Sequence, residues 1–397
     1  MANTTITTLL LALLCVSVVE SARNKFNPSN VETSICKSLV EPQGYTCQEH
    51  KVTTKDGHIL GLQRIPVGRS GKPADKPPVL LQHGLFMDAA TWLFNSPNES
   101  LAFILADRGY DVWLGNIRGT ESSRGHTSLS PNDPNFWNWS WDELAADDLP
   151  ANVQYVHDQT RQNLHYVGHS QGTLMALTAF SQRNLLNLIR SAALLSPVAY
   201  LSQMSTLLGR SVADTFLAEE IFWLGVHEFI PQGQQLAQLL KPICTQPGID
   251  CPSLLSAITG PNCCLNTSRT NLFLDHEPQS TATKNLIHLA QMVRWGKFAM
   301  YDYENPLENT RHYGQPSPPL YNIANIPIDL PLFLSYGGKD TLSDPNDVQR
   351  LLGDLKNHDK DKLVTQFIEN YAHMDFVIGV NANTVVYEPL IAFFQQH

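Results

Sequence analysis

The pentapeptide Gly168-His169-Ser170-Gln171-Gly172 carries the strongest chemical signal in the sequence. It follows the strand-like run LHYV and precedes the helix-like run TLMALTAF. A serine on a tight turn between a strand and a helix is exposed as a nucleophile, and glycines flank it because larger side chains would crowd the neighbouring elements. This context favours Ser170 as a catalytic nucleophile over a plain glycine-rich turn.

A serine hydroxyl attacks only when a histidine takes its proton and a carboxylate orients that histidine. After a turn of this kind the acid and then the histidine follow in the chain, each beyond a sheet strand. We therefore expect Asp340 to be the acid and His373 to be the base. Asp344 is the alternative acid, but it precedes Pro345 and a helical run, which favours a helix N-cap.

The remaining histidines are expected to have no catalytic role. His169 is adjacent to the serine but should point away from it, and His358 lies in the charged run NHDKDK, where we expect it to be solvated. Four others are interpreted as structural or surface residues: His227, His276, His288 and His312.

The oxyanion of an acyl-transfer reaction needs hydrogen-bond donors that are already oriented. One donor is expected from the backbone N–H of Gln171, directly after the serine. The other is expected from Leu85, because the apolar run VLLQ is followed by His83-Gly84-Leu85 and the glycine permits the turn. The alternative is that His83 and Gly84 only end a strand.

Several classes of function lack support in the sequence. It contains no H-E-x-x-H, Walker A or G-x-G-x-x-G pattern, so we expect no metal, nucleotide or dinucleotide cofactor. The net charge of -10 argues against binding to nucleic acid, whose phosphates attract basic proteins. Apolar residues make up 43% and charged residues 16% of the 397 residues, which is typical of a globular protein.

The N-terminus predicts export. The apolar run from Leu9 to Val19 is too short to span a bilayer and ends in small residues, which is typical of a secretory signal peptide over residues 1–22. A buried N-terminal helix is the alternative. No transmembrane segment is expected, and we predict a secreted protein, or one that stays in the secretory pathway, including a vacuole or lysosome.

Cysteines and glycosylation sequons agree with this prediction. Six cysteines remain after the signal, and an even number in a secreted chain favours disulfides. We expect Cys36 to pair with Cys47 and a cluster of bridges among the four cysteines between 244 and 264. The neighbours Cys263 and Cys264 are not expected to bond to each other. Three sequons predict glycans on surface loops, at Asn98, Asn138 and Asn266.

Short apolar runs alternate with helix-length stretches over most of the chain. The predicted buried strands are Val79 to Gln82, Asp111 to Leu114, His165 to Val167, Ala192 to Leu195, Leu330 to Ser335 and Val364 to Ile368. The predicted helices are Ser100 to Arg108, Trp141 to Gln159, Gln171 to Ser181 and Pro345 to Lys356. This alternation predicts an α/β fold with a largely parallel sheet covered by helices on both faces, preceded by a hairpin over residues 50–65.

Residues 200–325 interrupt the alternation and predict an inserted, mainly helical cap. The segment contains helical patterns at Val212 to Phe229 and Leu286 to Phe298 but no comparable strand runs. Its stretch FLAEEIFWLGVHEFI, residues 216–230, is apolar enough either to fill the cap or to meet lipid. The core is therefore expected in two parts, residues 23–199 and 326–397.

The motifs together resemble the acid lipase family of the α/β-hydrolase superfamily, which includes gastric and lysosomal acid lipases and plant triacylglycerol lipase-like proteins. The motifs that carry the resemblance are HGLFMDAATW at 83–92, DVWLGNIRGT at 111–120, GHSQG at 168–172, NLIHLAQMVRWGKFAMYD at 285–302, GGKDTLSDP at 337–345 and YAHMDFVIG at 371–379. They stand in family order and span nearly the whole mature chain. The Cys263-Cys264 doublet differs from the animal members, so disulfide positions are not carried over.

The resemblance implies an α/β-hydrolase fold and a lipase that cleaves carboxylic esters of neutral lipids, acting at a lipid–water interface without a cofactor. It implies Ser170 as nucleophile, Asp340 as acid, His373 as base, and Leu85 and Gln171 as the oxyanion donors. A short-chain esterase or an acyltransferase would share this machinery. A non-catalytic lipid-binding protein on the same fold would be expected to have lost part of it.

Overall fold

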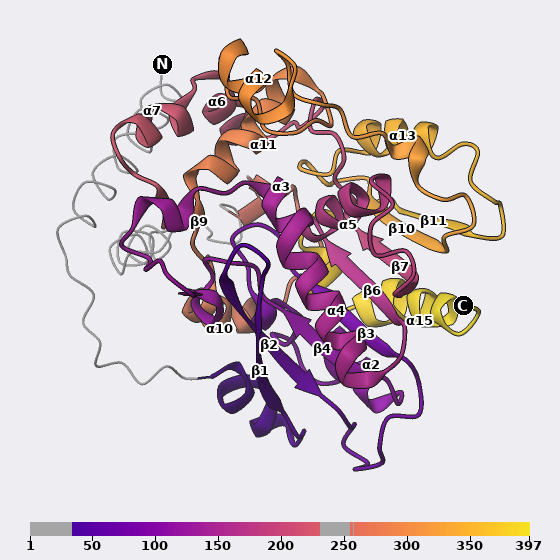
Figure 1. The fold of residues 1–397 in the computed structure, drawn as a ribbon. Coiled ribbons are helices and arrows are strands. Elements are labelled where there is room, and N and C mark those ends of the chain that lie inside the picture. The colour runs from indigo at the N-terminus through magenta and orange to yellow at the C-terminus, as the bar shows by residue number, and fades with distance from the viewer. Residues whose placement is uncertain (1–33, 231–254, 257) are drawn as a thin grey trace, which may run out of the picture.

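The computed structural model describes residues 34–230, 255–256 and 258–397. The predicted signal peptide and two of the cysteines, Cys244 and Cys251, lie outside these residues. A nine-stranded sheet runs through the described chain, and helices surround it (Figure 1). The predicted α/β architecture is confirmed.

The sheet has the strand order β1-β2-β4-β3-β6-β7-β10-β11, with β5 paired to β2. Its strands are β1 (Gln48–Thr53), β2 (His58–Ile65), β3 (Pro78–Gln82), β4 (Asp111–Gly115), β5 (Gly125–His126), β6 (Leu164–His169), β7 (Ile189–Leu195), β10 (Leu332–Gly337) and β11 (Leu363–Ile368). All pairs from β4 through β11 are parallel, and the pairs that involve β1, β2 or β5 are antiparallel. The hairpin expected over residues 50–65 is formed by β1 and β2.

Alternating side chains on the buried strands build two separate cores, one on each face of the sheet. On β3, for example, Leu80 belongs to one core while Val79 and Leu81 belong to the other. The first core also contains residues of α4 (Leu149–Thr160), α5 (Gln171–Ser181) and α13 (Pro345–Asp354). The second contains residues of α2 (Leu101–Asp107), α14 (Asp375–Ile378) and α15 (Glu388–Phe394). Because the sheet is covered on both faces, its central strands are apolar throughout rather than alternating in polarity.

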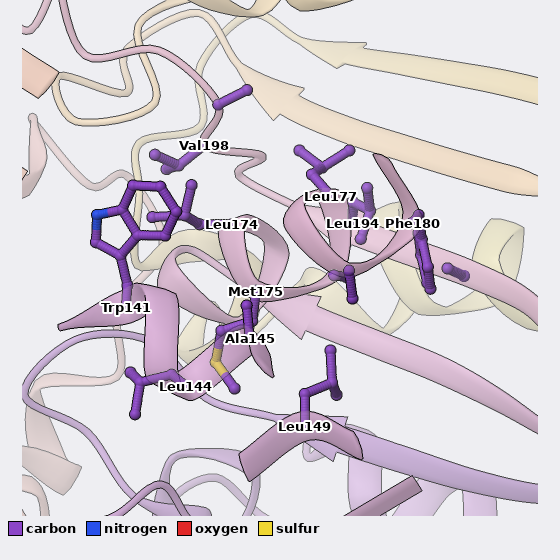
Figure 2. Close-up of a cluster of buried hydrophobic side chains, with 14 of the residues drawn as sticks. Trp141, Leu144, Ala145, Leu149, Leu174, Met175, Leu177, Phe180, Leu194 and Val198 are labelled. Carbon is purple, nitrogen blue, oxygen red and sulfur yellow. The ribbon is translucent and has the colours of Figure 1, made fainter. Parts of the chain in front are cut away.

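The first core packs α5 against the helical stretch that begins with α3 (Trp141–Glu143). Figure 2 shows Leu174, Met175 and Leu177 of α5 among Trp141, Leu144 and Leu149 of the facing stretch. The single helix expected from Trp141 to Gln159 is divided, since a π-helical turn at Leu144–Asp148 separates α3 from α4. This packing fixes the position of α5, the helix that begins directly after Ser170.

Between β7 and β10 the chain forms a second group of helices, most of them drawn at the top of Figure 1. The described elements are α6 (Leu207–Asp214), α7 (Leu217–Trp223), β8 (Glu228–Phe229), α10 (Thr270–His276), β9 (Thr281–Ala282), α11 (Thr283–Trp295) and α12 (Pro306–Tyr313). All lie within residues 200–325, which we call the cap segment; its boundaries as a domain stay a prediction.

Two expectations for the cap segment are wrong in detail. The helix expected from Val212 to Phe229 is broken between α6 and α7, where Phe216 adopts a left-handed backbone conformation. Its end is not helical, because Glu228 and Phe229 form β8 and pair with β9 in a two-stranded sheet. Periodicity alone did not predict β8, because such a short strand depends on a partner more than 50 residues away in the sequence.

The described disulfides agree with the sequence in one case and contradict it in the other. The predicted bridge between Cys36 and Cys47 is confirmed, with Cα atoms 5.3 Å apart. Cys263 and Cys264 bond to each other, so the expectation that these neighbours stay apart is wrong. Asp375 accepts hydrogen bonds from both backbone N–H groups of the doublet, which fixes its backbone against the loop that carries His373.

His358 is also placed differently from the expectation. It is buried rather than solvated, and its Nε2–H donates to the carbonyl oxygen of Leu330 at 2.7 Å. The charged neighbours that suggested exposure extend into solvent from a loop that folds back before β11. None of the described helices combines the length and apolar character that a bilayer crossing requires.

Candidate active site

Ser170 lies on the sharp turn between β6 and α5 and is partly exposed. Its backbone has φ 53° and ψ -117°, a conformation that side-chain-bearing residues rarely adopt. The turn is locked because the Ser170 N–H donates to the carbonyl oxygen of Leu195 at the end of β7. A Cβ at Gly172 would lie 2.5 Å from the carbonyl oxygen of Gln82, so only glycine lets α5 approach β3 this closely.

The structure brings Asp340 and His373 together at the same edge of the sheet. Asp340 follows β10 and His373 follows β11, and both side chains are buried. His373 Nδ1–H donates to the Asp340 carboxylate, at 2.9 Å from Oδ2 and 3.1 Å from Oδ1. This contact fixes the tautomer of His373, so that its Nε2 is free to accept a proton.

The surroundings of Asp340 keep it ionised. Burial alone would raise its pKa, but His373 and the Ser343 N–H hold the pKa of Asp340 below its usual value. The Leu342 N–H donates to the same oxygen, at 3.0 Å. Asp344, the alternative acid, accepts from the Asn346 N–H at the start of α13 and is therefore a helix N-cap.

The loop that carries His373 is braced from two sides. Its own Asp375 accepts hydrogen bonds from the N–H groups of Ala372, Cys263 and Cys264. From the cap segment, the carbonyl oxygen of Thr259 accepts from the His373 N–H at 3.1 Å. The position of the histidine therefore depends on residues more than 100 positions earlier in the chain.

The loop after β3 lies against Ser170. A Cβ at Gly84 would be 2.8 Å from the Ser170 Cβ and 3.3 Å from its Oγ, so this backbone passes directly beside the serine hydroxyl. His83 orients the loop: its Nδ1–H donates to the Gly84 carbonyl oxygen at 2.9 Å, and its Nε2 accepts from the Ile117 N–H at 3.2 Å. Burial lowers the pKa of His83 to about 4, so the ring stays neutral and keeps both bonds. Leu85 follows on this loop.

Gln171 is the first residue of α5, and a helix leaves the N–H groups of its first turn without an intrahelical acceptor. The Gln171 side chain is buried and donates to Asn285 Oδ1 of α11 at 3.1 Å. This bond joins the start of α5 to the cap segment. The dipole of the helix also places partial positive charge beside Ser170.

His169 serves the site without facing the serine. Its Nε2–H donates to the carbonyl oxygen of His373 at 3.0 Å, and burial lowers the pKa of His169 to about 3. The ring is neutral and supports the histidine loop, which agrees with the expectation that it is not the base.

Sequence reasoning missed the residues that position the site. They are His83, Asp375, Asn285 and the buried carboxyl groups of Asp88 and Glu277. His83, Asp88, Asn285 and Asp375 do lie within the quoted motifs, which was the available signal. Among the described residues one cluster has metal-ligand residue types, Cys263, Cys264 and Asp375. Its sulfur atoms are joined in the disulfide, so neither is a thiolate ligand.

Comparison with known proteins identifies the family. Residues 77–379 match the model of the alpha/beta hydrolase fold, and residues 36–96 match the partial alpha/beta-hydrolase lipase region. This chain belongs to the α/β-hydrolase family. The first match spans β3 through α14, which contains every element that positions the site of this α/β-hydrolase.

Curated relatives narrow the assignment to the acid lipase group, and the resemblance seen in the motifs is confirmed. Triacylglycerol lipase 2 of Arabidopsis thaliana is 52% identical over 366 residues, covering 91% of this chain and 88% of the relative. Human gastric triacylglycerol lipase is 37% identical over 386 residues and 94% of each chain. A solved monoglyceride lipase from Saccharomyces cerevisiae has a TM-score of 0.56 at 14% identity, covering 94% of this chain and 99% of that one, which shows the shared fold.

Proposed function

We propose that this carboxylic ester hydrolase is a secreted serine lipase that cleaves ester bonds of neutral lipids, such as triacylglycerol, through Ser170, Asp340 and His373. The single observation that carries the proposal is the bond between His373 Nδ1 and Asp340, formed at the sheet edge where Ser170 stands on its strained turn. Relatives named triacylglycerol lipases support the substrate class.

The arrangement supports a two-step reaction with balanced proton transfers. Ser170 Oγ attacks the ester carbonyl carbon while His373 Nε2 takes the hydroxyl proton, and Asp340 stabilises the imidazolium that forms. The proton then passes to the departing alcohol, which leaves an acyl-enzyme. Water, activated by the same histidine, releases the fatty acid. The N–H groups of Leu85 and Gln171 would stabilise the oxyanion in both steps.

An exposed apolar tip on the cap segment supports action on insoluble lipid. Trp223 and Leu224, at the end of α7, are 84% and 81% exposed, whereas Ile221 of the same helix is buried. Fully burying a large apolar side chain contributes about 1.5–3 kcal/mol, so this tip would favour contact with a lipid surface.

The tip gives a test that separates a lipase from a short-chain esterase. The unmodified protein should hydrolyse emulsified long-chain triacylglycerol. Trp223→Ser with Leu224→Ser should weaken that activity about ten- to hundredfold, which corresponds to losing about 1.4–2.8 kcal/mol, as for two side chains that a lipid surface buries in part. Turnover of a soluble short-chain ester should stay within about twofold, because the tip does not touch Ser170 in this proposal.

Two control variants distinguish contact with lipid from packing within the cap segment. Ile328→Ser removes a half-exposed apolar side chain before β10 and should change neither activity. Ile221→Ala should lower both activities together with the thermal midpoint. If the tip variant also lowered both activities equally, the tip would be packing and the lipid-surface role would be wrong. If the unmodified protein cleaved only short esters, or formed a new ester in preference to hydrolysis, lipase action itself would be contradicted.

Export is the remaining element of the proposal. The signal-like N-terminus, the Cys36–Cys47 bridge and the exposed positions of Asn98 and Asn138 support it. Asn266 is partly buried, so we expect it to be used less than the other two.

Mass spectrometry of protein from its native source should show a mature chain that begins near residues 21–25, glycans on Asn98 and Asn138, and disulfides. Enzymatic deglycosylation in heavy-oxygen water would mark each used asparagine. An intact Met1, unmodified sequons and free thiols at all six mature cysteines would contradict export.

A further inference from the structure

Two buried carboxyl groups face each other where the loop after β3 meets the cap segment. Asp88 belongs to the loop and Glu277 directly follows α10, and each side chain is almost fully buried. The two carboxyl groups lie within hydrogen-bonding reach of each other. Within the described residues Glu277 Oε2 has no N–H or O–H donor from any other group.

Two ionised carboxylates cannot occupy this position together at low cost. Burial raises the pKa of Asp88 to about 7, and nearby Glu121 adds to the rise. Burial and the facing Asp88 also hold the pKa of Glu277 well above its usual value. A pair in which one carboxyl group keeps its proton avoids this cost, as in other close carboxyl pairs.

The pair holds the segment that follows Leu85. The Asp88 N–H donates to Glu277 Oε1 at 2.9 Å, and the Asp88 carboxylate accepts from the Ala90 N–H at 2.7 Å. Next to it, the Phe86 carbonyl oxygen accepts from the Gln279 N–H of the cap segment at 2.7 Å. Phe86 has φ 60°, so its backbone conformation relies on such contacts.

We propose that Asp88 and Glu277 are positioning residues that share one proton and, in that state, hold the Leu85 loop against the cap segment, so that turnover falls when the proton is lost. The inference rests on the proposed function, because it takes Leu85 as an oxyanion donor. Neither residue touches the substrate; both act through the backbone of residues 85–88.

The direction of the pH effect follows from the raised pKa values. Folding raises the pKa of the Asp88 carboxyl from about 4 to about 7. The protonated carboxyl therefore contributes its full stabilisation below about pH 4, and this contribution is lost as the pH rises from about 4 to about 7. Glu121, on the 3-10 turn Glu121–Ser123, acts on Asp88, and His276 of α10 lies near Glu121 and Asp275. Burial lowers the pKa of His276, so it offers no positive charge in the upper part of this range.

The test uses neutral isosteres of the pair. In Glu277→Gln the amide keeps an acceptor for the Asp88 N–H and a donor toward the Asp88 carboxylate, but nothing between them can ionise into a repulsive pair. Because the pair no longer titrates, the alkaline limb of kcat for a soluble short-chain ester should move up by at least about one pH unit, giving at least about tenfold higher kcat than the unmodified protein at the top of the range. The KM should stay constant. Asp88→Asn is the second variant and should move the limb in the same direction.

Asp142→Asn is the matched control. Burial raises the pKa of Asp142 to about 7 as well, but this carboxyl accepts from the Tyr321 hydroxyl and the Tyr301 N–H, away from the Leu85 loop. Its alkaline midpoint should equal that of the unmodified protein. Circular dichroism at each pH ensures that only folded protein is compared. An unmoved midpoint in both folded pair variants overturns the proposal, whereas Ser170→Ala that stayed active would overturn the proposed function instead.

Discussion

Ser170→Ala is expected to lower kcat for ester hydrolysis by about 10⁴- to 10⁶-fold, because no other oriented nucleophile replaces the hydroxyl. His373→Ala should have a similar effect. The double variant should be little worse than either single one, since members of a triad act as a unit. Stopped assays at high enzyme concentration would measure the residual rates.

Asp340→Asn should lower kcat by about 10⁴-fold, because the amide favours the wrong tautomer of His373. Asp344→Asn is its matched control: the side chain still caps α13, so kcat should stay within about twofold of the unmodified protein. A fluorophosphonate probe should label Ser170, and Ser170→Ala should take up none. Labelling at another residue, or an Asp344 effect larger than that of Asp340, would refute the assignment.

Arg118→Met is expected to lower the free energy of unfolding by about 3–5 kcal/mol, because it leaves a buried carboxylate without its partner. Arg118 is 1% exposed and Asp148 is fully buried. The guanidinium contacts Asp148 Oδ1 at 2.6 Å and Asp56 Oδ2 at 2.5 Å, and the Arg118 N–H also donates to Asp148. Burial opposes its charge, but these carboxylates raise the pKa of Arg118 above its usual value.

The loss should be larger at pH 8 than at pH 5, because an unpaired Asp148 can take up a proton in acid and lose its buried charge. Urea unfolding at the two pH values measures the difference. Arg311→Met provides the control: its side chain is 73% exposed, and its pair with Glu308 should contribute less than about 0.5 kcal/mol. Equal losses in the two variants would show that the buried network does not stabilise the fold. Asp148→Leu added to Arg118→Met should restore part of the stability, since it removes the orphaned charge.

Local sterics made much of the fold readable from the sequence. A serine between two glycines, after a strand-like run and before a helix-like run, has few backbone solutions, and the structure shows the predicted turn with φ 53° at Ser170. The apolar runs named as strands lie in the sheet, and those at its centre are apolar throughout because both of their faces are covered. The expectation that Val364 to Ile368 is buried is wrong, because β11 is the edge strand and Phe367 is 54% exposed. Chain order then selected Asp340 and His373, which the fold brings within 2.9 Å.

Tertiary contacts decided what local patterns do not encode. Asp88 and Glu277 are 189 positions apart in the sequence, so no periodic pattern of residues predicts that they are buried against each other. Asp375 accepts hydrogen bonds from the backbone N–H groups of Cys263 and Cys264, more than 100 residues earlier in the chain, and the buried His358 donates to the carbonyl oxygen of Leu330. The sequence alone predicted the turn at Ser170 and the alternation of strands and helices around it, because these follow from sterics and apolar periodicity along the chain, and its motifs indicated the family. The tertiary structure decided the protonation states and supports of the site, because burial and pairing depend on which distant groups the fold brings together.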